Sequence, residues 1–352
     1  MEKMPKLSNN MPCFLVTPET VYVDITPKCN LRCRHCYSAD KNIKPKEKSY
    51  KQVCKILDDL AAAKVFKIHL VGREPLMRKD FEKIINYASQ HKFVIGVATN
   101  GTLITPSIAK LLSERNIDGV QISIDSICPE KHNDFRRNPN AFSLTFHGIE
   151  LLRKYNVKVC IATTLTNFNF NELKKIADFA NELGAYYYRT RLLIGNDINQ
   201  NFQITRKQYK YAVQILFNLK NHYKTMKVEQ LHHSFLFENK IQYDPSRSLT
   251  KLPCNAGYSR CSLTYDLKIT PCIALAKLYS APIKKSFKEE WQNNAVLDRW
   301  RNIVKSIKGK CAICGYRYIC GGGCRANVFG ATHDILSSDP WCWFNPYKHG
   351  IK

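Results

Sequence analysis

Three cysteines lie close together near the start of the chain, in the segment Cys29-Asn-Leu-Arg-Cys33-Arg-His35-Cys36. A [4Fe–4S] cluster takes four ligands, so three thiolates from one loop leave one iron open. Reactive metal sites keep an open position, whereas structural sites are closed. The spacing therefore predicts a reactive iron–sulfur site. The alternative is a structural zinc site in which His35 or a more distant residue is the fourth ligand.

A second group of cysteines lies in the last third of the chain. Its members are Cys254, Cys261, Cys272, Cys311, Cys314, Cys320, Cys324 and Cys342. These thiols suffice for two four-cysteine sites, and their spacing alone fits zinc and iron–sulfur equally well. The scattered thiols Cys13, Cys54, Cys128 and Cys160 are predicted to be ordinary small residues.

The framework that positions these cysteines is predicted from an alternation of apolar runs and amphipathic stretches. Strands are expected at 21–26, 67–71, 93–99, 119–124, 158–164 and 186–193. Helices are expected at 50–63, 80–91, 106–115, 142–155, 171–183 and 205–219. Six strand–helix units in a row predict an α/β fold with a parallel sheet, open or curled into part of a barrel. Chemistry is then expected at the carboxyl ends of the strands.

Composition excludes several classes of protein. The chain has 352 residues, of which 44% are hydrophobic, so it is not disordered. It contains no apolar run long enough to span a membrane and no visible signal peptide. Fifteen cysteines are too dilute for a small disulfide scaffold. A cytoplasmic globular protein is therefore expected.

The formal charge of +25 predicts a basic surface. The lysines are scattered over helix faces and no nucleic-acid-binding motif is present, so the sequence does not predict a nucleic-acid partner. The simplest interpretation is a solvated surface. A more specific one is a platform for an acidic peptide segment or a polycarboxylate tetrapyrrole.

The first cysteine motif, placed after the first strand, resembles that of the radical S-adenosylmethionine (SAM) enzymes. The resemblance implies that Cys29, Cys33 and Cys36 bind a [4Fe–4S] cluster whose open iron holds SAM. It further implies reductive cleavage of SAM to a 5′-deoxyadenosyl radical, which abstracts a hydrogen atom from the substrate.

The same resemblance implies contacts to SAM. Gly72-Arg73-Glu74-Pro75 stands where the family has Gly-Gly-Glu-Pro, so Glu74 is expected to hold the SAM amino group, although Arg73 replaces a glycine. The other expected SAM-binding residues, taken from matching positions, are His35, Tyr37, Gly72, Asn100, Ser123, Asp125 and Leu193.

The later cysteines resemble the SPASM extension, which carries two auxiliary [4Fe–4S] clusters. The resemblance implies that Cys254, Cys261, Cys272 and Cys324 bind the first, and Cys311, Cys314, Cys320 and Cys342 the second. The predicted fold is thus a partial (βα)6 TIM-like barrel with a cysteine-rich SPASM extension. Its expected parts are an N-terminal segment (1–20), the barrel (21–223), a bridging segment (224–253) and the extension (254–352).

The predicted function is modification of a residue in a ribosomally made peptide or protein by crosslinking, epimerisation or oxidation. Ile273 follows Cys272 where sulfatase-maturing relatives have an aspartate base, which argues against that activity. A relative acting on a tetrapyrrole of a haem pathway is the first alternative, and a zinc-binding interaction module is the second. A flavodoxin or ferredoxin is the expected electron donor. The residue that quenches or deprotonates the substrate radical is not identified, and Tyr258, Tyr265 and Asp266 are candidates by position only.

Overall fold

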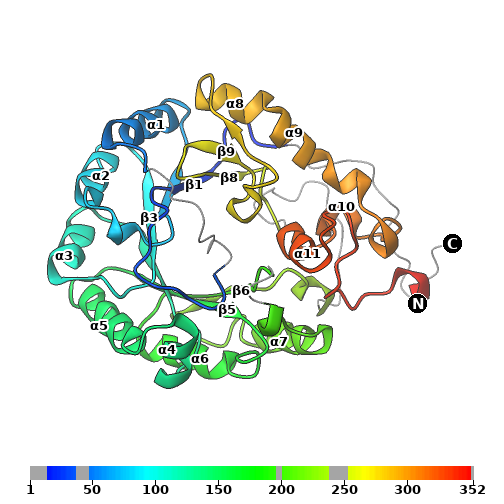
Figure 1. Cartoon of the computed structure of the whole chain (residues 1–352). Coiled ribbons are helices and arrows are strands. Elements are labelled where there is room, and N and C mark those ends of the chain that lie inside the picture. The colour runs from blue at the N-terminus through cyan, green and yellow to red at the C-terminus, as the bar shows by residue number, and fades with distance from the viewer. Residues whose placement is uncertain (1–13, 37–46, 196–199, 238–252, 350–352) are drawn as a thin grey trace.

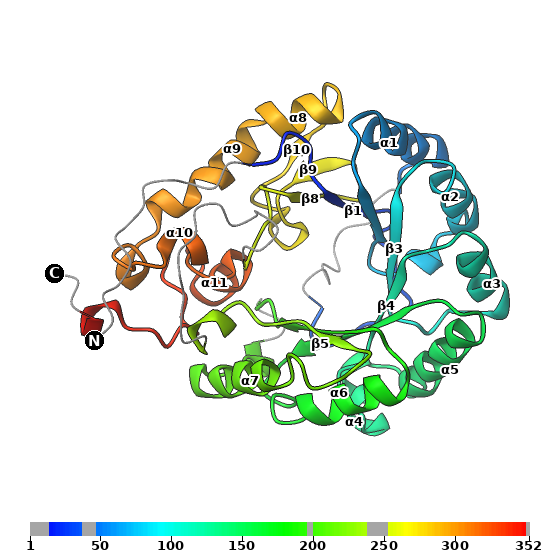
Figure 2. The same cartoon turned by 180° about the vertical axis from the view of Figure 1, so that it is seen from behind.

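The computed structural model describes residues 14–36, 47–195, 200–237 and 253–349. Its centre is one curved sheet with the strand order β10-β9-β8-β1-β2-β3-β4-β5-β6-β7. Figures 1 and 2 show the sheet curling into an incomplete barrel. The strands are β1 (Thr20–Asp24), β2 (Lys67–Val71), β3 (Val94–Thr99), β4 (Gly119–Ser123), β5 (Val159–Leu165), β6 (Tyr187–Leu192), β7 (Lys227–Val228), β8 (Arg260–Leu263), β9 (Lys268–Thr270) and β10 (Ala281–Pro282).

Pairing is parallel from β8 through β1 to β7 and antiparallel from β8 to β9 and from β9 to β10. Helices cover the outside of the sheet (Figure 1). They are α1 (Tyr50–Ala62), α2 (Phe81–Ala88), α3 (Pro106–Glu114), α4 (Pro129–Arg136), α5 (Ala141–Lys154), α6 (Leu173–Glu182) and α7 (Arg206–Asn218).

Side chains alternate between the two faces of each strand. On β1, Val21 and Val23 are fully buried in the core between sheet and helices. Tyr22 points to the inner face and stacks on His69 of β2, with 4.8 Å between ring centroids. The next strand carries Gly96 beside that ring, where any Cβ would lie 2.4 Å from His69 Nδ1. The outer face is therefore apolar and the inner face polar.

The C-terminal region lies between the two edges of the sheet (Figures 1 and 2). It contains α8 (Phe287–Asn293), α9 (Ala295–Asn302), α10 (Arg317–Cys320) and α11 (Arg325–Thr332). Asn327 of α11 donates to the carbonyl of Leu193 after β6 (3.3 Å), and Trp341 Nε1 donates to that of Ile204 (2.8 Å). These contacts tie the cysteine-rich region to the barrel edge opposite β8.

The predicted barrel agrees with the structure. Each predicted strand ends within two residues of an observed one, from β1 to β6. The sequence missed the polar helix α4 and the short strands of the C-terminal region. The predicted boundary between residues 253 and 254 precedes β8, which extends the barrel sheet by pairing with β1.

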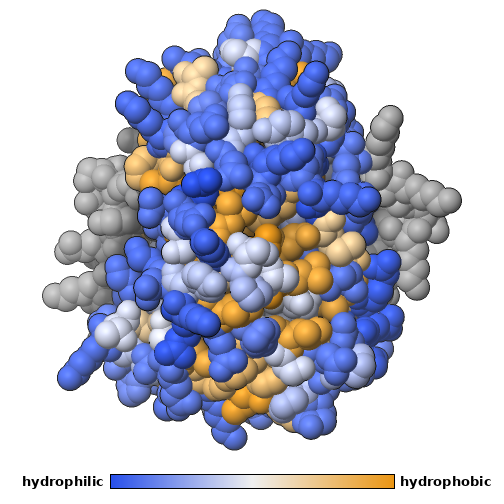
Figure 3. All heavy atoms as spheres, turned by 90° about the vertical axis from the view of Figure 1, so that its left-hand side faces the viewer, coloured by the Kyte–Doolittle hydropathy of each residue, from blue (hydrophilic) through white to orange (hydrophobic). Residues whose placement is uncertain are grey.

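The outer surface is largely hydrophilic. Figure 3 shows one side of the molecule, where hydrophilic residues dominate the upper part and hydrophobic residues gather lower down. Among the described residues, no helix combines the length and apolar character needed to cross a bilayer.

Candidate active site

The three-cysteine loop leaves the carboxyl end of β1, as predicted. Its thiols are half-buried and near enough to one another for their charges to interact. Cys29 Sγ accepts a hydrogen bond from the Leu31 N–H (3.4 Å), and the Asn100 amide nitrogen lies 4.0 Å from the same sulfur. The loop therefore presents its three thiols together at one end of the sheet, beside the end of β3.

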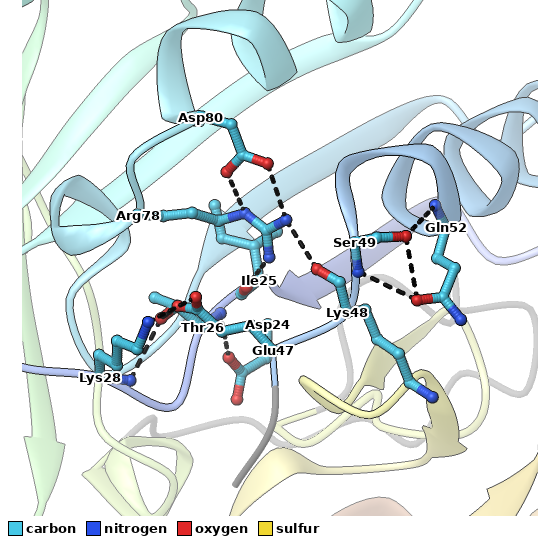
Figure 4. Close-up of polar contacts among 10 residues, drawn as sticks. All are labelled: Asp24, Ile25, Thr26, Lys28, Glu47, Lys48, Ser49, Gln52, Arg78 and Asp80. Carbon is cyan, nitrogen blue, oxygen red and sulfur yellow. Dashed lines mark hydrogen bonds and ion pairs between the residues drawn. The ribbon is translucent and has the colours of Figure 1, made fainter.

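Arg78 fixes the base of this loop (Figure 4). Its buried guanidinium donates through Nη1 to the carbonyl of Ile25 (2.7 Å) and through Nη2 to that of Lys48 (2.8 Å). Asp80 accepts from Nε (2.6 Å) and so holds the guanidinium in place. One side chain thus joins the end of β1 to the segment that begins α1.

Glu47 makes a second connection to the same loop (Figure 4). Its carboxylate accepts a hydrogen bond from the Thr26 hydroxyl and pairs with Lys28 Nζ at 2.7 Å. Ser49 then begins α1 with a reciprocal capping box to Gln52. Both described segments that flank residues 37–46 are consequently anchored at the end of β1.

Glu74 joins the ends of β2 and β3. It is fully buried, and its carboxylate accepts hydrogen bonds from the Thr99 hydroxyl (2.7 Å) and the N–H groups of Asn100 (2.7 Å) and Leu76 (3.1 Å). These contacts position the two loops that follow β2 and β3. The predicted contact of Glu74 with the SAM amino group stays a prediction.

Asp125 is engaged by an arginine. It is fully buried, and its Oδ2 accepts from Arg136 Nε (2.8 Å) and Nη2 (2.5 Å), while Oδ1 accepts from the Thr164 N–H (2.9 Å). Burial alone would raise the pKa of Asp125, but the Arg136 guanidinium outweighs it and holds that pKa below its usual range. Arg136 lies near enough to Cys33 for their charges to interact, so Asp125 positions a cation beside the cysteine loop. The predicted contact of Asp125 with SAM stays a prediction.

His35 and Gly72 both pack closely against neighbours at the cysteine loop. His35 stacks on Phe135 of α4 with 4.3 Å between ring centroids. Burial, with Arg136 nearby, lowers the pKa of His35 to about 3, so the ring is neutral. A Cβ at Gly72 would lie 2.9 Å from the carbonyl oxygen of Thr26, so only glycine lets the two loops approach this closely.

The other residues predicted to contact SAM differ in their contacts and in their exposure. Asn100 bonds to Asn30 in the cysteine loop (2.9 Å), and Ser123 ends β4 half-buried. Leu193 follows β6 but is only 3% exposed, which leaves little surface for adenine. Tyr37 lies outside the described residues.

The second auxiliary set is brought together as predicted. Cys311, Cys314, Cys320 and Cys342 all line one pocket. His233, Phe235 and Phe344 contribute to the same wall. A pocket bordered by all the predicted thiols suits a [4Fe–4S] cluster with four cysteine ligands.

The first auxiliary set is not brought together completely. Cys254, Cys272 and Cys324 interact electrostatically with one another and border the same small apolar cluster. Cys261 sits on β8 opposite Val21, is fully buried and belongs to the core between sheet and helices. Strand alternation thus turns the Cys261 thiol toward the core and away from the other three thiols in this structure, and its predicted role as a cluster ligand stays a prediction.

Two histidines of the bridging segment approach the second set. His232 Nε2 lies 2.8 Å from the carbonyl oxygen of Cys320 and 3.5 Å from its sulfur. His233 Nδ1 lies 3.3 Å from the Tyr209 hydroxyl.

The sequence did not predict a role for Arg136, Arg260 or these two histidines. The Pro129 that begins α4 was the one available indication for Arg136.

The positional candidates for radical quenching receive little support. The Tyr258 hydroxyl donates to the carbonyl of Arg301 (2.7 Å), and burial raises the pKa of Tyr258 to about 12. Asp266 pairs with Lys268 at 2.8 Å. Tyr258 and Asp266 are thus engaged by neighbours on their own side of the sheet.

In the described parts of the chain, no three His, Cys, Asp or Glu side chains are placed to hold one metal ion.

Comparisons with known proteins decide the family. Residues 23–180 match the model of the radical SAM superfamily. An AdoMet-dependent heme synthase of Methanosarcina barkeri is 30% identical over 94% of this chain and 98% of its own length. This chain belongs to the radical SAM superfamily.

Three further similar proteins carry names other than heme synthase. The mycofactocin maturase MftC of Mycolicibacterium smegmatis is 27% identical over 97% of this radical SAM chain and 87% of its own length. Among solved structures, the match to Streptococcus suis SuiB with bound S-adenosylmethionine covers 94% of this chain and 78% of the SuiB chain. The sequence identity is 17% and the TM-score is 0.78. Native anSMEcpe with bound AdoMet reaches a TM-score of 0.72 at 18% identity, over 94% of this chain and 95% of its own. These structures share the fold of this chain.

This radical SAM enzyme uses a [4Fe–4S] cluster and SAM as cofactors. Its cysteine loop fits that role, because it presents three half-buried thiols close together at the carboxyl end of β1. When bound, the cluster and SAM supply the 5′-deoxyadenosyl radical. The chain itself orients the loop through Arg136, Arg78 and Glu47.

Proposed function

We propose that this radical SAM enzyme abstracts a hydrogen atom from a tetrapyrrole that carries carboxylate side chains. The observation that carries this proposal is the charge of the inner face of the sheet. Tyr22 interacts there electrostatically with the guanidinium groups of Arg189, Arg191 and Arg260. Glu229 is the carboxylate that forms ion pairs with Arg189 and Arg191. The excess of cationic groups favours an anionic substrate.

The comparisons support the same substrate class. The heme synthase of Methanosarcina barkeri is matched over nearly its whole length at 30% identity. Heme synthases of Oleidesulfovibrio alaskensis and a pre-heme d1 synthase of Dinoroseobacter shibae are 28% and 24% identical. Two fully ligated auxiliary clusters would favour a peptide substrate, but the thiol of Cys261 faces the core and does not lie with the other three thiols of the first set.

Peptide modification is the second candidate. It is supported by the mycofactocin maturase, which is 27% identical over 97% of this chain, and by the SuiB fold, solved with its precursor peptide SuiA. A peptide with acidic residues would also suit the basic surface.

We further propose the cluster ligands. Cys29, Cys33 and Cys36 would hold the SAM cluster, and Cys311, Cys314, Cys320 and Cys342 one auxiliary cluster. Cys254, Cys272 and Cys324 would supply three ligands to the other. The auxiliary clusters would take up the electron left on the substrate radical or relay one from flavodoxin or ferredoxin. A cytoplasmic location would keep these thiols reduced.

The test compares two substrates in one assay. Anaerobically reconstituted enzyme, SAM and a reductant are mixed with an iron porphyrin bearing four carboxylate side chains, or with an acidic peptide. We expect the porphyrin to stimulate formation of 5′-deoxyadenosine and to change in mass, and the Cys33→Ala variant to do neither. Stimulation by the peptide alone would favour the second candidate.

A further inference from the structure

Arg260 occupies an unusual place at the edge of the barrel. It begins β8, where its backbone pairs with Thr20 of β1. Its neighbour Cys261 points into the apolar core, so strand alternation directs Arg260 to the opposite, inner face. An arginine is thereby placed inside the curve of the sheet, at the junction with the cysteine-rich region.

The surroundings of Arg260 are thiols and a phenol. Cys254, Cys272 and Tyr22 are the groups whose negative forms would interact with its guanidinium. Arg189 lies on the same face and repels it. Within the described ranges of the chain, no residue makes a hydrogen bond or ion pair with the Arg260 side chain.

The other inner-face arginines are already engaged. Arg189 Nε pairs with Glu229 (2.7 Å) and its Nη1 donates to Gln121 (2.8 Å). Arg191 Nη2 pairs with the second oxygen of Glu229 (2.7 Å). These contacts hold the guanidinium groups of Arg189 and Arg191 against the sheet. Of these three arginines, only Arg260 donates no side-chain hydrogen bond to a residue that the structure describes.

Arg260 is half-buried, and a guanidinium that is partly withdrawn from water is stabilised by an anionic acceptor. Its planar fork matches a carboxylate in a bidentate arrangement. We propose that the guanidinium of Arg260 binds a carboxylate of the substrate at the inner face of the sheet, beside the thiols of Cys254 and Cys272. This inference rests on the proposed tetrapyrrole substrate and names the residue that recognises it.

Binding without turnover tests the inference. Reconstituted holoenzyme is titrated anaerobically with a metal-free porphyrin bearing four carboxylate side chains, and with its neutral tetramethyl ester, by absorbance. We expect wild type to bind the acid more tightly than the ester. Arg260→Gln should lose about tenfold to a hundredfold in affinity for the acid, the loss typical of a charge-assisted contact. Arg260→Lys keeps the charge and should lose less.

Controls separate this role from a structural one. Arg153→Gln removes an exposed charge on α5 and should bind the acid as wild type does. Iron content and thermal midpoint are measured for every variant. An Arg260→Gln enzyme that has lost iron but keeps its porphyrin affinity would show that Arg260 only balances the charge of the thiolates, which overturns the inference.

The two proposals fail differently. If wild type and Arg260→Gln bind the acid equally, the role of Arg260 is wrong and the tetrapyrrole proposal stands. If Arg260→Gln misfolds, the test uses Arg260→Lys instead. The carboxylate contact is overturned if Arg260→Lys binds the acid as tightly as wild type does and wild type binds the acid and the ester equally. If wild type binds neither porphyrin, both proposals fail.

Discussion

Arg136 holds Asp125 through two hydrogen bonds, from Nε (2.8 Å) and Nη2 (2.5 Å), and both side chains are buried. The same guanidinium lies near enough to Cys33 for their charges to interact. One ion pair beneath α4 therefore connects the end of β4 to the cysteine loop. The geometry of the proposed SAM cluster consequently depends on a residue 100 or so positions away in the sequence.

Breaking this pair should destabilise the protein. Asp125→Asn leaves the Arg136 charge buried without its partner, which costs about 3–5 kcal/mol. The Asp125→Asn, Arg136→Gln double variant should cost less than the sum of the single changes. Thermal midpoints under anaerobic conditions measure both effects, and strictly additive losses would contradict the pairing.

The pair also predicts acid sensitivity. The pKa of Asp125 lies below its value of about 3.9 in an unfolded chain, so its contribution to stability is fully present above about pH 4. That contribution is lost as the pH falls through the folded pKa. Asp125→Asn should flatten this part of the stability curve, and an unchanged curve would argue against a lowered pKa.

Asp24 should have the opposite pH dependence. Burial raises the pKa of Asp24 to about 7, although the Thr26 N–H and Arg73 oppose the shift. The folded chain then binds a proton that the unfolded chain releases, so stability falls as the pH rises from about 4 to about 7. Asp24→Asn should raise stability at pH 8 by about 1–4 kcal/mol and change little at pH 4. A variant less stable than wild type at pH 8 would refute this.

Glu74→Gln should weaken both folding and SAM binding. In either orientation the new amide group points a donor at the Asn100 N–H or at the Leu76 N–H, which costs about 1–3 kcal/mol. The matched control Glu82→Gln lies on the exposed face of α2 and should behave as wild type. Equilibrium dialysis and thermal unfolding measure the two effects. Weaker SAM binding at full stability would instead support Glu74 as a direct SAM contact.

Cys261→Ala should keep its iron. The thiol lies in the core under α8, so the change removes packing and costs about 1–2 kcal/mol. Cys272→Ala removes a proposed ligand and should lose the iron of the first auxiliary site. Iron analysis of the two variants, side by side, distinguishes the roles. Equal iron loss in both would support Cys261 as a cluster ligand.

Sequence periodicity was sufficient for the barrel, because each strand and helix from β1 to α7 other than α4 carries its own apolar pattern. It could not place α4, whose sequence is mostly polar, and Arg136 was missed with it. It also could not decide which face of β8 carries Cys261. A shift of one residue along a strand moves a side chain from the core between sheet and helices to the inner face of the sheet. Only the pairing of β8 with β1 shows which of these faces carries Cys261. Glu74 and Asp125 were found by position, while their burial appears only in three dimensions.

The central claim is that this chain is a radical enzyme with three iron–sulfur clusters. Iron, sulfide and zinc per chain, measured after anaerobic purification and reconstitution, test it most directly. The account predicts about twelve irons with matching sulfide and no zinc, four irons for each cluster. Zinc in place of iron at the cysteine loop would contradict it.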